Sequence, residues 1–219
     1  MKKILVFRGG WDGHEPVQTT DMVAAELRRR GATVDVFDDQ ECLTKGNLVS
    51  DYAAVVPAWT MGELIPDGSK ALLEAVAAGV GLGGWHGGMC DAFRTNCDYQ
   101  FMTGGQWVAH PGGVIDYTVH VCGTGTDPIV AGISDFPMHS EQYYLHVDPA
   151  NEVLATTTFD GSHCAWINGT VMPVVWKRMF GKGRVFYSSL GHCAEDFRRS
   201  PQILEIAVRG ILWAAAPNA

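Results

Sequence analysis

Apolar and polar positions alternate in blocks along the first half of the chain. Residues 2–8, 33–37 and 52–58 are short apolar stretches of the kind that form buried parallel strands. Residues 16–30 and 66–78 carry apolar side chains at helical spacing, and each begins with a proline, which is favoured in the first turn of a helix. Strands alternating with helices predict an α/β fold in which a mostly parallel sheet of flavodoxin-like strand order has helices on both faces.

The second half of the chain is predicted to extend this sheet. Residues 93–113 contain two Gly-Gly pairs and four aromatic side chains, which indicates a long structured loop or a short helix. Further strands are expected at 114–121, 152–158, 173–179 and 184–189. The glycines of the turn at 181–183 predict that the last two strands form an extra β-hairpin. A final helix is expected to begin at Pro201 after the cap residue Ser200, and one domain to cover residues 1–219.

A histidine stands between two glycine pairs in the middle of the chain. The segment 83–88 reads G-G-W-H-G-G and follows a short apolar stretch. Glycines on both sides of one residue suit a very tight strand-turn-helix, as in the G-x-nucleophile-x-G elbow. The pattern therefore predicts that His86 is held out at the carboxyl end of the sheet. The alternative is a glycine-rich turn whose histidine only bonds to nearby backbone.

Composition and charge narrow the classes of partner and location. A formal net charge of −8 over 219 residues argues against a nucleic-acid groove or an anionic membrane surface, which need clustered Lys and Arg. The six cysteines form no C-x-x-C pair and are expected to be free thiols in a reducing compartment. The apolar run at residues 4–7 is too short for an export signal, so a cytoplasmic location is expected. The pair Lys177 and Arg178 is interpreted as a solvated strand end.

Loops that follow parallel strands meet at one edge of a sheet, and aromatic side chains are frequent in these loops. Aromatic faces beside a few polar groups are typical of sites that hold sugars. The predicted substrate contacts are Trp11, Asp12, His14, Trp59, Trp85, Trp107 and Tyr143. They favour a carbohydrate-sized ligand, although each tryptophan taken singly could equally be a core residue.

Two kinds of chemistry are compatible with the remaining polar residues. In the first, a divalent metal such as zinc is bound by imidazoles and one carboxylate. The candidate ligands are His14, His86, His139, Glu141 and His192. In the second, no metal is needed: Glu141 or His192 is the general base and a neutral His86 donates to or accepts from a sugar oxygen. Both make His86, His192 and Glu141 the catalytic candidates, and neither requires a nucleotide cofactor.

The other histidines are interpreted as structural. They lie in predicted strands or turns with no accompanying motif: His110, His120, His146 and His163.

Three segments in the same order along the chain resemble the ThuA family of trehalose-utilisation proteins. They are G-G-W-H-G-G at 83–88, H-S-E-Q-Y-Y at 139–144 and P-V-V-W-K-R-M-F-G-K-G-R-V-F-Y-S-S-L-G-H at 173–192. The resemblance spans nearly the full chain and implies a class I glutamine amidotransferase-like fold. It places His192 where the amidotransferases have a catalytic histidine, with Glu195 nearby. Because His86 stands where their nucleophilic cysteine would be, glutaminase activity is not expected.

The resemblance also implies a role in carbohydrate metabolism. The expected substrate is trehalose or a related disaccharide, including 3-keto-sugars made by a sugar dehydrogenase of the same pathway. Acid/base or metal-assisted isomerisation, elimination and hydrolysis all remain open. The alternative is a non-enzymatic carbohydrate-binding or assembly module on the same fold. A homo-oligomer is compatible with either function.

Overall fold

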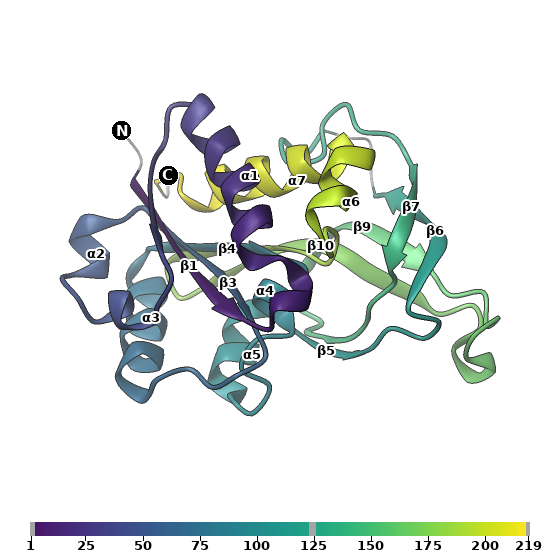
Figure 1. Cartoon of the computed structure of the whole chain (residues 1–219), viewed down its shortest axis with the longest axis horizontal. Coiled ribbons are helices and arrows are strands. Elements are labelled where there is room, and N and C mark those ends of the chain that lie inside the picture. Colours follow the sequence, from purple (N-terminus) through teal and green to yellow (C-terminus); the bar gives the residue numbers. More distant parts are fainter. Residues whose placement is uncertain (1–2, 123–125, 218–219) are drawn as a thin grey trace.

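A nine-stranded sheet runs through the middle of the molecule, in the computed structural model that describes residues 3–122 and 126–217 (Figure 1). Its strand order is β2-β1-β3-β4-β11-β10-β9-β6-β7. The first five strands of this order are parallel to one another: β1 (Lys3–Gly10), β2 (Thr33–Phe37), β3 (Ala54–Thr60), β4 (Gly81–Trp85) and β11 (Gly183–Ser188). The predicted flavodoxin-like order is therefore confirmed. Lys2, expected in the first strand, lies outside the described residues.

The remaining four strands extend the sheet in an antiparallel arrangement. They are β10 (Val171–Phe180), β9 (Glu152–Thr158), β6 (Val114–Val121) and β7 (Phe136–Glu141). The predicted hairpin is β10–β11, which turns at Gly181. A separate two-stranded sheet pairs β5 (Gly105–Ala109) with β8 (Tyr144–Val147). The region 93–113 thus contains a strand that the sequence did not predict.

Helices cover both faces of the parallel part of the sheet (Figure 1). One layer holds α1 (Pro16–Arg29), α6 (Ala194–Arg199) and α7 (Pro201–Ala214). The other holds α2 (Leu48–Asp51), α3 (Pro66–Ala78) and α5 (Cys97–Thr103), with the short α4 (His86–Cys90) following β4. Short 3₁₀ turns lie at η1 (Asp12–His14), η2 (Glu41–Leu43) and η3 (Ala165–Ile167). None of the helices in the described residues is long and apolar enough to cross a membrane.

The helical layers explain why the first strand is apolar on both sides. Ile4 and Val6 belong to the core beneath α1 and α7, whereas Leu5 and Phe7 belong to the core beneath α3 and α5. A strand covered on both faces needs apolar side chains at every position, and this produces the unbroken runs seen in the sequence.

Candidate metal centre

His86 stands at a sharp strand-turn-helix at the carboxyl end of β4. Its φ angle is +45°, a left-handed conformation that is unusual for a residue with a side chain. A Cβ at Gly84 would lie 2.9 Å from that of Met89, and one at Gly88 would lie 2.9 Å from the Cα of Ala58. The glycines therefore permit backbone contacts that no other residue would allow, as the elbow pattern predicted.

Four side chains from distant parts of the chain converge beside this elbow. His14 comes from η1, Glu141 from the end of β7, and His192 from the loop after β11. Glu141 Oε2 lies 3.2 Å from His86 Nε2, 3.3 Å from His192 Nδ1 and 3.7 Å from His14 Nε2. One potential ligand atom from each of the four lies within 4.8 Å of all the others. This is the spacing of ligands around a single cation.

The outer nitrogens of two imidazoles already have partners. His86 Nδ1 lies 2.8 Å from the carbonyl oxygen of Ser189, and His14 Nδ1 lies 2.9 Å from Thr60 Oγ1. A carbonyl oxygen only accepts, so His86 Nδ1 must carry the proton and its Nε2 has a free lone pair. Holding the outer nitrogen in this way is how proteins orient a metal-binding histidine.

The ionisation of these groups leaves negative charge and lone pairs facing one another. Burial lowers the pKa of His86 to about 4 despite the neighbouring carboxylate, so this imidazole is neutral near pH 7. Burial raises the pKa of Glu141, but the His14, His192 and His86 imidazoles outweigh it and hold this pKa below its ordinary value. His86 Nε2 and the ionised Glu141 Oε2 therefore face each other with no proton between them.

His192 differs from His86 in the direction of its pKa shift. Burial alone would lower the pKa of His192. The neighbouring Glu141 carboxylate raises this pKa by more, so the net value lies above the ordinary one. Its Nδ1 is buried without a well-formed hydrogen bond to any described residue. An orphaned imidazole nitrogen, a lone pair and a carboxylate around one point fit a divalent cation, because three nitrogens and one oxygen form a ligand set typical of zinc.

Two aromatic side chains and one glycine complete the walls of the cluster. The Tyr143 ring stacks on His86 with centroids 4.1 Å apart and is buried. The Trp11 ring meets His14 edge-on at 4.9 Å and is 47% exposed, so it lies at the mouth. A Cβ at Gly87 would lie 2.3 Å from the His14 ring, so this imidazole packs directly on glycine backbone.

The other predicted substrate contacts divide into two groups. Asp12 is exposed in η1, and Trp107 is half-buried with its ring 6.3 Å from that of Tyr143, so both lie near the cluster. Trp59 instead packs on Phe7 and over Gly9.

Trp85, another predicted substrate contact, lines a small hollow with His14 and His86, but little of it reaches solvent. Its side chain is buried in the core beneath α1 and α7, edge-on to Phe197. Neighbouring residues on a strand point to opposite faces, so a side chain next to His86 in sequence turns into the helical layer.

His139, also predicted as a metal ligand, lies outside the group of four side chains that converge. His139 is half-exposed on β7, and its Nδ1 lies 2.7 Å from Asp116 Oδ1 on β6. Two residues along a strand span roughly 7 Å, which is enough to separate His139 from Glu141 and the centre.

His110 was interpreted as structural but lies at the centre. Its Nε2 is 3.7 Å from Glu141 Oε1, the carboxylate oxygen that faces away from the three other imidazoles. No spacing in the sequence marks it, because it follows β5, a strand that was not predicted. Thr60 ends β3 at the same carboxyl edge, where its hydroxyl holds the His14 ring.

The thiols offer no alternative nucleophile. Burial raises the pKa of Cys90, which is buried beneath the elbow, and also raises that of Cys193. Neither cysteine is therefore a thiolate near neutral pH.

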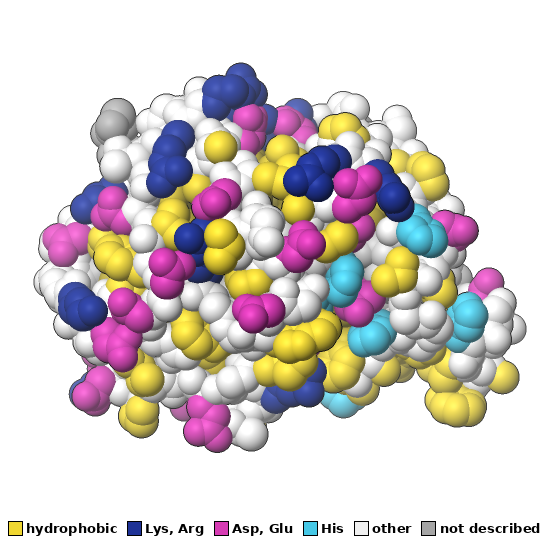
Figure 2. Space-filling view, viewed as in Figure 1, with side chains coloured by type: hydrophobic (Ala, Val, Ile, Leu, Met, Phe, Trp, Pro, Cys, Tyr) yellow, Lys and Arg dark blue, Asp and Glu magenta, His cyan; other side chains and the backbone are white. Residues whose placement is uncertain are grey.

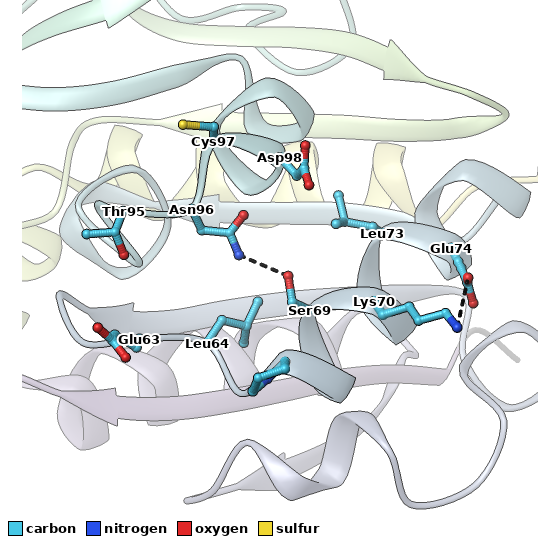
Figure 3. Close-up of a pocket in the computed structure, with 11 residues that line it drawn as sticks. Glu63, Leu64, Ser69, Lys70, Leu73, Glu74, Thr95, Asn96, Cys97 and Asp98 are labelled. Carbon is cyan, nitrogen blue, oxygen red and sulfur yellow. Dashed lines mark hydrogen bonds and ion pairs between the residues drawn. The ribbon is translucent and has the colours of Figure 1, made fainter.

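A larger hollow lies away from the cluster, between α3 and α5 (Figure 3). Its volume is about 810 Å³. Two pairs of polar groups in it contact each other: Asn96 Nδ2 donates to Ser69 Oγ at 2.9 Å, and Lys70 Nζ lies 4.0 Å from Glu74 Oε1. We assign no chemistry to it.

Fold and site together define an α/β protein of flavodoxin-like strand order with a histidine-rich centre at the carboxyl edge of its sheet. The chain matches the profile of the ThuA family, described as trehalose utilisation, over residues 3–214, and it belongs to that family. No curated protein matches the chain.

Solved structures show the same fold at low sequence identity. A ThuA-like protein from Bacteroides uniformis ATCC 8492 is 18% identical with a TM-score of 0.79, covering 97% of this chain and 91% of that one. One from Parabacteroides merdae ATCC 43184 is 18% identical with a TM-score of 0.77, covering 98% and 90%. A cytoplasmic protein from Salmonella typhimurium LT2 is 15% identical with a TM-score of 0.65, covering 97% of each.

Proposed function

We propose that this chain is a metal-dependent enzyme of carbohydrate utilisation whose centre is formed by His14, His86, His192 and Glu141. The observation that supports it most directly is the contact between His86 Nε2 and Glu141 Oε2 at 3.2 Å. Both atoms carry lone pairs, since His86 Nδ1 is committed to the Ser189 carbonyl. Such a contact is stable only with a cation or a proton between the two atoms.

The residues of the centre would each have a defined task. A bound divalent ion would supply a Lewis acid that polarises a carbonyl or hydroxyl oxygen of the sugar. His86 and His14 orient their inner nitrogens through Ser189 and Thr60. The buried Tyr143 ring stacks on His86 on the inner side of the centre, while the Trp11 ring is exposed on its solvent side.

The substrate class follows from the family and from these aromatic side chains. Trehalose utilisation is the description of the family, and aromatic faces such as Trp11 and Trp107 suit the apolar face of a sugar ring. We infer a neutral disaccharide or its 3-keto form as substrate, with isomerisation or elimination beside the carbonyl as the reaction. A sugar dehydrogenase would supply the keto form, and the cytoplasm would be the site of action. Hydrolysis of glutamine is not proposed, because His86 cannot form a thioester.

Metal analysis tests the centre. Protein purified without an affinity tag should contain about one equivalent of a divalent metal, and His86→Ala should lose most of it. His139→Ala is the matched control, because this histidine is exposed and pairs with Asp116 outside the centre. Wild type free of metal after purification and after zinc addition would contradict the proposal.

Turnover tests the enzymatic half of the proposal. Wild type should act on a member of a panel of disaccharides and their 3-keto forms, and removal of the metal or His86→Ala should lower the rate by roughly a hundredfold or more. His146→Ala, a change at an exposed histidine on β8 that is not one of the proposed ligands, should retain the wild-type rate. Binding of sugars without turnover would instead favour a carbohydrate-binding module.

A further inference from the structure

A cavity of about 530 Å³ opens on the surface formed by β6, β7 and the loop after β9. It begins at residues that flank the metal centre: Gln142 follows Glu141 in the chain, and Val114 is the strand partner of Glu141. Figure 2 shows histidine side chains gathered on this side of the molecule. The cavity is therefore next to the proposed catalytic centre rather than elsewhere on the surface.

Most of the residues that line the cavity are polar, beside the apolar side chains of Val114 and Ile115. Hydroxyl, amide, imidazole and carboxylate groups line it, and neither lysine nor arginine is among them. Asp116 and Asp160 would repel a phosphate or carboxylate group. Mixed donors and acceptors without a positive charge suit a neutral ligand that carries many hydroxyl groups.

Several of these polar groups are held in place by the protein. His139 Nδ1 pairs with Asp116 at 2.7 Å, which leaves Nε2 directed away from that carboxylate. Gln142 is buried, and its Nε2 donates to Thr157 Oγ1 at 2.8 Å. Donors and acceptors fixed before binding reduce the entropy lost when a ligand is ordered.

One close contact joins the cavity to the metal centre. The His163 ring lies so near Gly112 that a Cβ there would be 2.6 Å from it, and Gly112 has a φ of +93°. Gly112 belongs to the turn that begins at His110, whose Nε2 lies 3.7 Å from Glu141 Oε1. The same turn therefore contacts His163 in the cavity and places His110 beside Glu141 at the centre.

We propose that this cavity is the subsite for the second ring of a neutral disaccharide whose first ring lies at the metal centre. The inference rests on the proposed function. Its volume lies within the range of roughly 300–1,000 Å³ found for small-molecule sites, ample for one sugar ring. The subsite makes the protein selective for disaccharides over monosaccharides and for neutral sugars over phosphorylated ones.

Binding to variants of the zinc-loaded protein tests the subsite. Thr118 is exposed in the cavity, so Thr118→Trp fills it without disturbing the core, and His163→Ala removes one wall. Calorimetry should show that either change weakens trehalose binding by about tenfold or more and leaves glucose binding within about twofold. Thr33→Trp, on the strand at the opposite edge of the sheet, should change neither.

The outcomes separate the two proposals. Zinc content should equal that of wild type in all three variants, because none of the changed residues belongs to the centre. Trehalose affinity unaffected by Thr118→Trp, or zinc-loaded wild type that binds glucose as tightly as trehalose or binds neither, would overturn the subsite while the metal centre stands. Failure of wild type to take up zinc would overturn the proposed function itself.

Discussion

His86 occupies a backbone conformation that costs a residue with a side chain about 1–3 kcal/mol. Two hydrogen bonds hold it there: Tyr187 Oη donates to the His86 carbonyl oxygen at 3.0 Å, and His86 Nδ1 donates to the Ser189 carbonyl oxygen. One bond holds the backbone and the other holds the imidazole, so His86 is oriented before any ligand arrives. A rigid lone pair aimed at a carboxylate is useful to a metal and unfavourable without one.

Acid should destabilise the metal-free protein through His86. An unfolded imidazole titrates near 6.5, whereas burial lowers the folded pKa to about 4. Between these values the unfolded state binds more protons, so stability falls as the pH falls, by roughly 3 kcal/mol in total. His192 has the opposite sign: its raised pKa gives a contribution that is present in acid and lost as the pH rises.

Urea unfolding at pH 7 and pH 4 measures this effect after a chelator has removed metal. The wild type should lose roughly 3 kcal/mol more stability between the two pH values than His86→Gln, which cannot titrate. Equal losses in the two proteins would show that His86 is not a neutral buried group.

At the scale of elements, ion pairs between a strand and its neighbouring strands and loops depend on positions that composition does not reveal. Lys177 and Arg178 were expected to be solvated, but both are largely buried on β10. Lys177 pairs with Asp127 and Glu152, and Arg178 with Asp148. Neighbouring strands and loops supply the acids, so the correct interpretation required the antiparallel extension of the sheet.

Gly210→Ala should destabilise the protein, although alanine is the better helix former. In α7 a Cβ at this position would lie 2.3 Å from the Phe186 ring of β11, so the helix must move away from the sheet. Overpacking of this kind costs about 1–3 kcal/mol, more than the gain of roughly 1 kcal/mol in helix propensity.

Thermal unfolding of two glycine variants checks this. Gly68→Ala in α3 is the control, because its new Cβ would meet side-chain atoms of Ile65 and Leu43, which can adjust. Gly210→Ala should have the lower melting temperature of the two. A Gly210→Ala protein as stable as wild type would contradict the close packing of α7 on β11.

The whole molecule shows which features a sequence can predict. Apolar runs gave the parallel strands, and His14 and His86 were grouped because each follows a strand that ends at the same edge. His192 was added by resemblance to a family, and Glu141 was named as a candidate acid without a strand that fixed its position. It ends β7, the edge strand of the antiparallel extension, where the direction of a side chain depends on twist and register. The position of His139 on the same strand depends on these features too.

Removal of metal should lower the stability of the whole protein. The four proposed ligands come from η1, the elbow, β7 and the loop after β11, so an ion bound only by the folded state would stabilise all these parts together. Free zinc at a hundred times its dissociation constant would add about 2.7 kcal/mol. A chelator should lower the melting temperature of wild type and leave that of His86→Ala unchanged. An unchanged wild type would argue against a metal bound in the native state.

The order of the ligands along the chain also sets when the centre can be completed during synthesis. His14 emerges early, whereas His192 is translated after most of the polypeptide, a delay of on the order of ten seconds at ordinary ribosome speeds. Nascent chains therefore present an incomplete set of the proposed donors, and a prematurely terminated product that lacks the last imidazole would bind an ion less tightly. The proposed metal would accordingly be taken up after release from the ribosome, from the cell's pool of free ions.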